Sequence, residues 1–379
     1  MKTIYLIFIE LFYSLWSIFF ISGDKSYMLA DGLNVLGYVC TEAWKTSRGS
    51  SLWIINFISN GIYSYIYPQW MHCNQDPPYF LIYILNQLFI ILTILITCKY
   101  VKDNLSRLIL LFSVIYGSFT SGVASKEAFL GFIFTLLATF IVKNLREENN
   151  IKKKIWVTLV ILILILTLSL SRLTYIIILI PFLYSICVIK NKVNPLIKIS
   201  NKLLLLIITI APFAITLNVI SYILDISGLS FGSILLDYID RFKYLEAEDS
   251  VGFLTSSFTI KGSIYKVLVT IFGYKHLLYS INDKNTPLTI SYFCTKISIA
   301  YIILKSYYLI IRNYLFKNTV NNYSFESIYL SLLLAANLLS IFIYPYAHER
   351  YFLPSTSFAL IIISFYNSYT KKSNGIHLI

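Results

Sequence analysis

The chain alternates long apolar runs with short charged loops, and this alternation limits its fold more than any other feature. Each of about ten runs approaches the length that a helix needs to cross roughly 30 Å of hydrocarbon. The runs are Ile4–Ile21, Tyr79–Ile96, Arg107–Ser121, Ala128–Val142, Ile155–Leu170, Leu173–Ile189, Leu203–Leu224, Leu288–Ile311, Ser327–Tyr344 and Phe352–Tyr366. A backbone inside lipid must satisfy its own hydrogen bonds, so the runs predict an all-α transmembrane bundle of about ten spans.

The composition supports one membrane domain over residues 1–379. Hydrophobic residues make up 57% of the chain and charged residues 13%, about half the charged share of soluble domains. A soluble fold could not cover this much apolar surface, whereas a bilayer can. The first run, Ile4–Ile21, is too long and too aromatic for a cleaved signal peptide, and we expect it to stay as the first span.

The excess of basic residues predicts the orientation. Loops 99–107, 143–154 and 190–202 hold three, five and four Lys or Arg residues, which places them and both termini in the cytoplasm. The net charge of +13 therefore marks orientation, and no basic motif of a nucleic-acid-binding domain accompanies it. If Ile264–Ser280 crossed the membrane, the basic residues Arg312, Lys317, Lys371 and Lys372 would lie outside, against the positive-inside rule. We therefore expect this stretch to be amphipathic or re-entrant on the outer face.

Two long regions are then expected outside the membrane, at 22–78 and 225–287. Both are too short and too apolar for separate domains, and we expect interfacial helices that lie on the bundle. Cys40 and Cys73 fall in the first region, where they could form a disulfide or remain two free thiols. The sequence has no CxxC motif and no His/Cys cluster, so no metal and no other cofactor is predicted.

Three isolated cations are expected near the outer face, where positive charge is disfavoured. Lys126 lies in GVASKEAFLG at a helix start, whose free N–H groups would suit a phosphate, although an interfacial pair with Glu127 would explain it as well. Arg172 lies in LSLSRLTY and could grip a phosphate with two hydrogen bonds or serve only as a snorkelling residue. Arg241, in DYIDRFKYL, could bind a lipid diphosphate or belong to a solvated surface.

A second cluster occupies the turn YPYAHERYFLP at the outer end of the ninth run. His348, Glu349 and Arg350 are adjacent there, and Pro345 and Pro354 bracket them and would break the flanking helices. The turn would hold an acid/base group, a carboxylate and an anion-binding side chain together. The alternative is an interfacial turn anchored by tyrosines.

Acidic residues supply candidates for a general base. Asp31 in ADGLNVLGY is our candidate for a base acting on a sugar hydroxyl, with Asp24, Glu42 and Asp76 as alternatives in the same outer region. Glu10 lies in the middle of the first span, where a carboxylate is costly and is expected to find an intramembrane partner.

These residues give the chain a resemblance. The segments SKEAFL at Ser125–Leu130, SRLTY at Ser171–Tyr175 and HERYFLP at His348–Pro354, in a chain of about ten spans with a large late outer loop, resemble the bacterial oligosaccharide repeat-unit polymerases. This is the Wzy or O-antigen polymerase group, with the related EpsG-type proteins. The first outer region, with Asp31 and DPPYFL at Asp76–Leu81, is similar to membrane glycosyltransferases of the GT-C type, but it lacks their usual paired carboxylates.

The resemblance implies a glycosyltransferase in the bacterial inner membrane. Its substrate would be an undecaprenyl-diphosphate-linked oligosaccharide at the periplasmic face, and its reaction the transfer of the growing glycan onto an incoming unit. Arg172, Arg350 and Lys126 would neutralise the leaving diphosphate without a metal. Membrane lipid is an expected partner. The resemblance leaves open whether a regulator protein that sets chain length is another.

Other functions remain open at this point. An O-antigen ligase would place a key His and Arg in the late outer loop, which offers His276 and Arg241. A repeat-unit flippase should show internal repeats and charges that line the midplane, but the sequence shows no repeat and its isolated cations are expected at the outer edge. A membrane acyltransferase should carry an early catalytic His, but His72 is the only early one and lies in a loop. The sequence contains neither a Walker A nor a Rossmann motif, so it does not indicate a nucleotide-driven pump.

Overall fold

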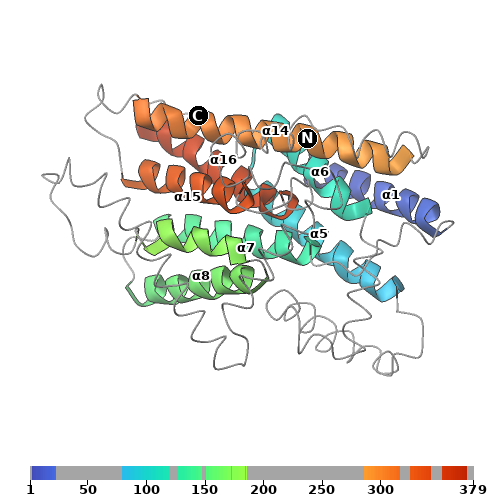
Figure 1. Ribbon diagram of the computed structural model, residues 1–379, viewed down its shortest axis with the longest axis horizontal. Coiled ribbons are helices and arrows are strands. Elements are labelled where there is room, and N and C mark those ends of the chain that lie inside the picture. The colour runs from blue at the N-terminus through green and yellow to red at the C-terminus, as the bar shows by residue number, and fades with distance from the viewer. Residues whose placement is uncertain are drawn as a thin grey trace, which may run out of the picture.

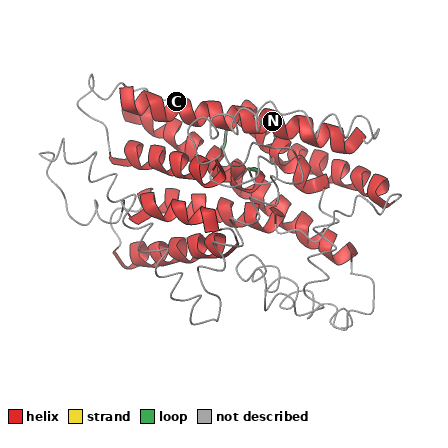
Figure 2. Ribbon diagram, in the orientation of Figure 1, coloured by secondary structure: helices red, strands yellow, loops and turns green. Residues whose placement is uncertain are grey.

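The computed structural model is a bundle of helices, and it describes residues 2–22, 79–119, 127–146, 151–171, 173–183, 185, 286–315, 325–342 and 352–373. The α-helices are α1 (Thr3–Ser22), α5 (Tyr79–Tyr100), α6 (Asn104–Phe119), α7 (Glu127–Arg146), α8 (Ile151–Ser171), α14 (Thr286–Leu315), α15 (Phe325–Phe342) and α16 (Thr356–Ser373), joined by two 3-10 helices, η5 (Leu173–Ile178) and η9 (Leu353–Ser355). Within these ranges no strand occurs (Figures 1 and 2). The all-α prediction is confirmed for this part of the chain.

Helix α7 lies at the centre of the packing. It contacts α5, α8, α16 and η9, whereas α1 packs at one side against α6, α5 and α14 (Figure 1). Helix α14, 30 residues long, runs along α6 and also contacts α15 and α16. The core that results is formed by residues from all of these helices.

The apolar runs predicted the described helices closely. The predicted spans at 4–21, 79–96, 107–121, 128–142, 155–170, 288–311, 327–344 and 352–366 each overlap a helix along their described residues, and the last begins with the 3-10 helix η9. Most helices are longer than the apolar run that predicted them, because the polar residues next to the run are also helical. Helix α7, for example, continues through Lys143 to Arg146.

The predicted span at 173–189 begins differently. Residues Leu173–Ile178 form a 3-10 helix, and α-helical backbone follows at residues 179–183. Pro181 gives the physical reason: a proline lacks the N–H and its ring clashes with the carbonyl four residues before it, but it is tolerated in a first helical turn. The tighter 3-10 turn therefore precedes the proline.

Basic residues gather at one end of the bundle. Thr3 of α1 lies beside Cys98 of α5, and Ser364 Oγ of α16 donates to the Tyr100 carbonyl at 2.9 Å. Lys99, the start of α1 and the last turns of α16 thus share one end, here called the basic end. The pattern is the one that the positive-inside rule predicts for a single membrane face.

The short turn between α5 and α6 at the basic end is held by its own polar groups. Asp103 Oδ2 accepts from the Ser106 backbone N–H at 2.8 Å and so caps α6. Arg107 Nε donates to the Val101 carbonyl at 2.9 Å, which satisfies a backbone group at the end of α5. A polar turn of this kind fixes two neighbouring helices as an antiparallel pair.

The outward faces of the bundle are apolar. Helix α1 exposes Ile4, Phe8 and Phe12 at helical spacing, while Glu10, Ser14 and Ser17 on other faces are fully buried. An apolar outside with polar groups inside is unfavourable in water and expected in lipid. Three described helices are long and apolar enough to cross a membrane, with windows at Tyr83–Tyr100, Glu127–Leu145 and Thr286–Ile311.

Several predictions concern residues outside the described ranges. They are the span Leu203–Leu224, the outer regions 22–78 and 225–287 almost entirely, the segment Ile264–Ser280 and the pair Cys40 and Cys73. The total number of spans therefore stays a prediction.

Candidate functional site

None of the seven predicted site residues is among the described residues. These are Asp31, Lys126, Arg172, Arg241, His348, Glu349 and Arg350. Their grouping in space stays a prediction. The described residues next to three of them in the sequence do have defined positions, and they lead to one region of the bundle.

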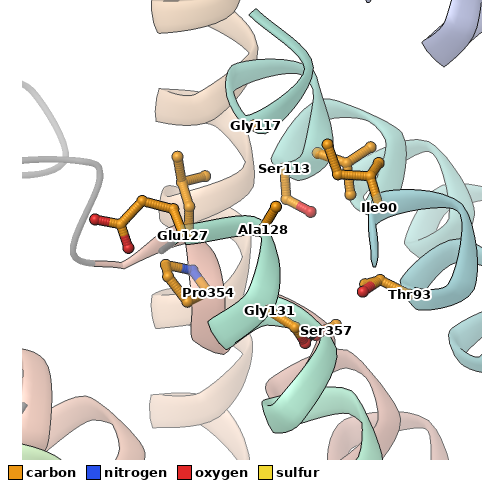
Figure 3. Close-up of a pocket in the computed structure, with 11 residues that line it drawn as sticks. Ile90, Thr93, Ser113, Gly117, Glu127, Ala128, Gly131, Pro354 and Ser357 are labelled. Carbon is orange, nitrogen blue, oxygen red and sulfur yellow. Dashed lines mark hydrogen bonds between the residues drawn. The ribbon is translucent and has the colours of Figure 1, made fainter. Parts of the chain in front are cut away.

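A cavity opens at the end of α7 opposite the basic end. Its empty space, including the open mouth, is about 450 Å³. Helices α5, α6, α7 and α16 and the 3-10 helix η9 all contribute to its wall (Figure 3). The lining residues are Ile90, Thr93, Ser113, Val114, Gly117, Glu127, Ala128, Gly131, Leu353, Pro354 and Ser357.

The cavity lies deep along α5. The ring centroids of Phe89 and Phe129 are 5.2 Å apart, so the first turn of α7 packs beside a residue ten positions after the start of α5 at Tyr79. At about 1.5 Å of rise per residue, α5 continues about 15 Å past the start of α7. The cavity therefore faces the middle of α5, where Ile90 and Thr93 lie.

Small residues make room for the cavity. A Cβ atom placed on Gly131 would come 3.9 Å from the Pro354 backbone, and one on Gly117 would come 3.5 Å from Ile90 Cδ1. Both distances are ordinary van der Waals contacts, so an alanine would fit at either position and would take up part of the space beside it. Small residues at helix interfaces are common in membrane bundles.

Hydroxyl groups line the cavity between α5, α6 and α16. Ser113 Oγ donates to the Leu110 carbonyl at 2.7 Å, and Ser357 Oγ accepts from Thr135 Oγ1 at 2.8 Å. Thr93 is 5% exposed, and its hydroxyl has no hydrogen-bond partner among the described residues. Glu127 stands at the other side of the first turn of α7, away from Ile90 and Thr93 (Figure 3).

The described parts of the three motif segments converge on α7. Glu127 and Ala128, from SKEAFL, line the cavity together with Leu353 and Pro354, from HERYFLP. Tyr175, from SRLTY, packs edge-on against Phe134 of α7 with centroids 4.9 Å apart. SRLTY, about 40 residues later in the sequence, and HERYFLP, about 220 residues later, thus both meet the first three turns of α7.

A second polar region joins α1 to α5 and α14. Gln87 Nε2 donates to Ser14 Oγ at 2.6 Å, and Ser14 Oγ lies 3.3 Å from the Tyr83 hydroxyl. Tyr13 donates to the Pro287 carbonyl. Glu10, which is fully buried, lies close enough to Tyr83 to interact electrostatically. The intramembrane surroundings expected for Glu10 are therefore a hydroxyl-rich contact between α1 and α5.

The sequence interpretation missed the cavity. Thr93 is one of three polar residues in the apolar run Tyr79–Ile96, with Asn86 and Gln87, and polar residues inside a membrane often mark functional positions. The proximity of Gly131 and Pro354 has no signal in the sequence, because it arises only when η9 packs on α7. Within the described ranges, no three His, Cys, Asp or Glu side chains come together as a metal site, and Cys98 and Cys294 are buried free thiols.

No family model, curated protein or solved structure matches this chain.

Proposed function

We propose that this chain polymerises undecaprenyl-diphosphate-linked oligosaccharide repeat units of a bacterial surface polysaccharide. The observation that carries the proposal is the convergence of the described parts of SKEAFL, SRLTY and HERYFLP on the first three turns of α7. Three segments that together resemble one enzyme group would be expected to share a site, and their described residues do lie around one helix.

The cations of the proposal are close in sequence to these residues. Lys126 directly precedes Glu127, Arg172 directly precedes Leu173, and Arg350 precedes Phe352 by two positions. Consecutive Cα atoms are about 3.8 Å apart, so each cation is tied closely to a segment that packs on or near α7. A shared anion site for a diphosphate is the simplest use of three such cations.

The proposed reaction moves one glycan from lipid to sugar. A hydroxyl of the incoming unit attacks the anomeric carbon of the growing chain, and a base, Asp31, His348 or Glu349, takes the hydroxyl proton. The bond between the anomeric carbon and the diphosphate oxygen breaks as the new glycosidic bond forms. Undecaprenyl diphosphate leaves with the electron pair, and Lys126, Arg172, Arg350 and Arg241 offset its developing charge.

The proposed location follows from the charges. The basic end, with Lys99, Lys102 and Arg107, would face the cytoplasm together with both termini. The cavity lies toward the other end and would face the periplasm. The chain would then act in the inner membrane on substrates that have already crossed it.

Deleting the gene and separating the surface polysaccharide on a gel tests the proposal. We expect the ladder of long chains to disappear while single capped units remain. Arg172→Ala and Arg350→Ala should reproduce the deletion at unchanged protein levels, whereas Lys143→Ala at the basic end should keep the ladder. Loss of single units as well would indicate a flippase or ligase, and an intact ladder in the deletion strain would refute polymerisation.

A further inference from the structure

The cavity beside α7 offers a specific set of hydrogen-bonding groups. Ser113 Oγ and Ser357 Oγ direct their hydrogens to the Leu110 and Gly131 carbonyls, at 2.7 and 3.4 Å, so each oxygen is left to accept. Ser357 Oγ already accepts from Thr135, which leaves Ser113 Oγ as the more available acceptor. The Thr93 hydroxyl is uncommitted and can donate.

Apart from Glu127, which lies at the far side of the first turn of α7 (Figure 3), the rest of the wall is apolar. Ile90, Val114, Ala128, Leu353 and Pro354 surround the hydroxyls, and Gly117 and Gly131 add no side chain. None of the described lining residues is a cation, and Glu127 adds a carboxylate. A group that fits this wall should carry no negative charge and should combine an apolar part with one acceptor for Thr93 and one donor for Ser113.

We propose that this cavity binds the acetamido group of an N-acetylated amino sugar. The amide carbonyl accepts from the Thr93 hydroxyl, the amide N–H donates to Ser113 Oγ, and the methyl group contacts the apolar wall formed by Ala128 and its neighbours. The inference rests on the proposed function for its setting, a lipid-linked oligosaccharide, and assigns the cavity the task of selecting one sugar of that substrate.

Other ligand groups fit the same wall less well. A phosphate would meet the Glu127 carboxylate and no cation among the described lining residues, and burial of an unpaired anion is costly. An isoprenoid chain would leave the Thr93 hydroxyl buried without a hydrogen-bond partner, which is unfavourable for a polar group. A sugar hydroxyl alone could pair with Thr93 but would leave the apolar wall without a matching group.

Saturation-transfer NMR on the full chain in lipid nanodiscs tests the inference, with N-acetylglucosamine and glucose as probes. We expect saturation of the acetyl methyl protons of N-acetylglucosamine and several-fold weaker binding of glucose. Thr93→Val, which keeps the shape and removes the hydroxyl, should weaken binding about fivefold, the effect of one lost hydrogen bond. Thr93→Ser should restore it.

Thr97 provides a matched control. It lies one turn further along α5, is fully buried, and its hydroxyl also has no hydrogen-bond partner among the described residues, but it does not line the cavity. Thr97→Val should leave acetyl saturation unchanged, and Ala128→Leu should abolish it by filling the cavity. Equal loss in both Val variants, or no acetyl saturation in the unsubstituted chain, would overturn the inference.

The two proposals fail separately. An acetyl signal that depends on Thr93, together with a normal polysaccharide ladder after gene deletion, would support the sugar site and reject the polymerase. Loss of the ladder after deletion, together with an acetyl signal that ignores Thr93→Val, would support the polymerase and reject the sugar site.

Discussion

Helices α1 and α7 are each 20 residues long and rich in apolar residues, but the bundle holds them in different ways. Helix α7 is buried by rings, with Phe134 edge-on to both Tyr175 and Phe358. Helix α1 turns the rings of Tyr5, Phe8 and Phe12 outward, Phe8 being 71% exposed, and meets α5 through Ser14 and Gln87. In lipid, apolar character does not decide which face points inward, so ring packing and hydrogen bonds decide it.

The two helices should differ most in how far the free energy of unfolding falls when one aromatic ring is removed. Phe134→Ala should lower the free energy of unfolding by about 3–5 kcal/mol, because it leaves a cavity between α7, η5 and α16. Phe8→Ala removes a ring that faces outward and should change it by less than about 0.5 kcal/mol. Unfolding by SDS in mixed micelles would measure both, and equal costs would show that the outward face of α1 packs against protein.

A smaller effect is expected at the contact of α1 with α5. A double-mutant cycle with Ser14→Ala and Gln87→Leu should give a coupling energy of about 1 kcal/mol, because their hydrogen bond is buried away from water. The same SDS titration would measure it. A coupling near zero would mean that close packing, rather than this hydrogen bond, holds α1, and the contrast with α7 would weaken.

The smallest effect is expected at the hydrogen bond between α7 and α16. Thr135 Oγ1 donates to Ser357 Oγ at 2.8 Å but also to the Gly131 carbonyl at 2.8 Å, so its hydrogen is shared. The cycle with Thr135→Val and Ser357→Ala should therefore couple by about 0.6 kcal/mol, the average for hydrogen bonds between membrane helices. A value larger than that of the Ser14–Gln87 pair would reverse the ranking of the two helices.

The helices were predictable and the cavity was not, for a physical reason. An apolar run of about 20 residues has one stable form in lipid, so α1, α5 and α14 follow from local sequence. The tighter turn before Pro181 was missed because the apolar run crosses the proline without interruption. The cavity depends on contacts such as Gly131 with Pro354, which lie 223 positions apart and carry no local signal.

Parts of the candidate site were visible in the sequence. Glu127 follows Lys126 in SKEAFL, and Leu353 and Pro354 belong to HERYFLP, so both segments of the resemblance contain lining residues. Thr93 and Ser113 were not, because a hydroxyl in an apolar run usually bonds to its own helix backbone. Ser113 does so, and only the packed bundle shows that Thr93 does not.

The length of α14 has a consequence for the surrounding lipid. Its 30 residues span about 45 Å, while the hydrocarbon layer is about 30 Å thick. Tyr13, half-way along α1, contacts Pro287 at the start of α14, so most of α14 runs from there toward the basic end and its last turns reach headgroup level. Lys305 Nζ lies 5.3 Å from the Tyr308 ring centroid there, and half-exposed Tyr307 and Tyr308 suit that boundary. Membranes with longer acyl chains would let this helix stand more upright, because its last turns already extend beyond a hydrocarbon layer of ordinary thickness.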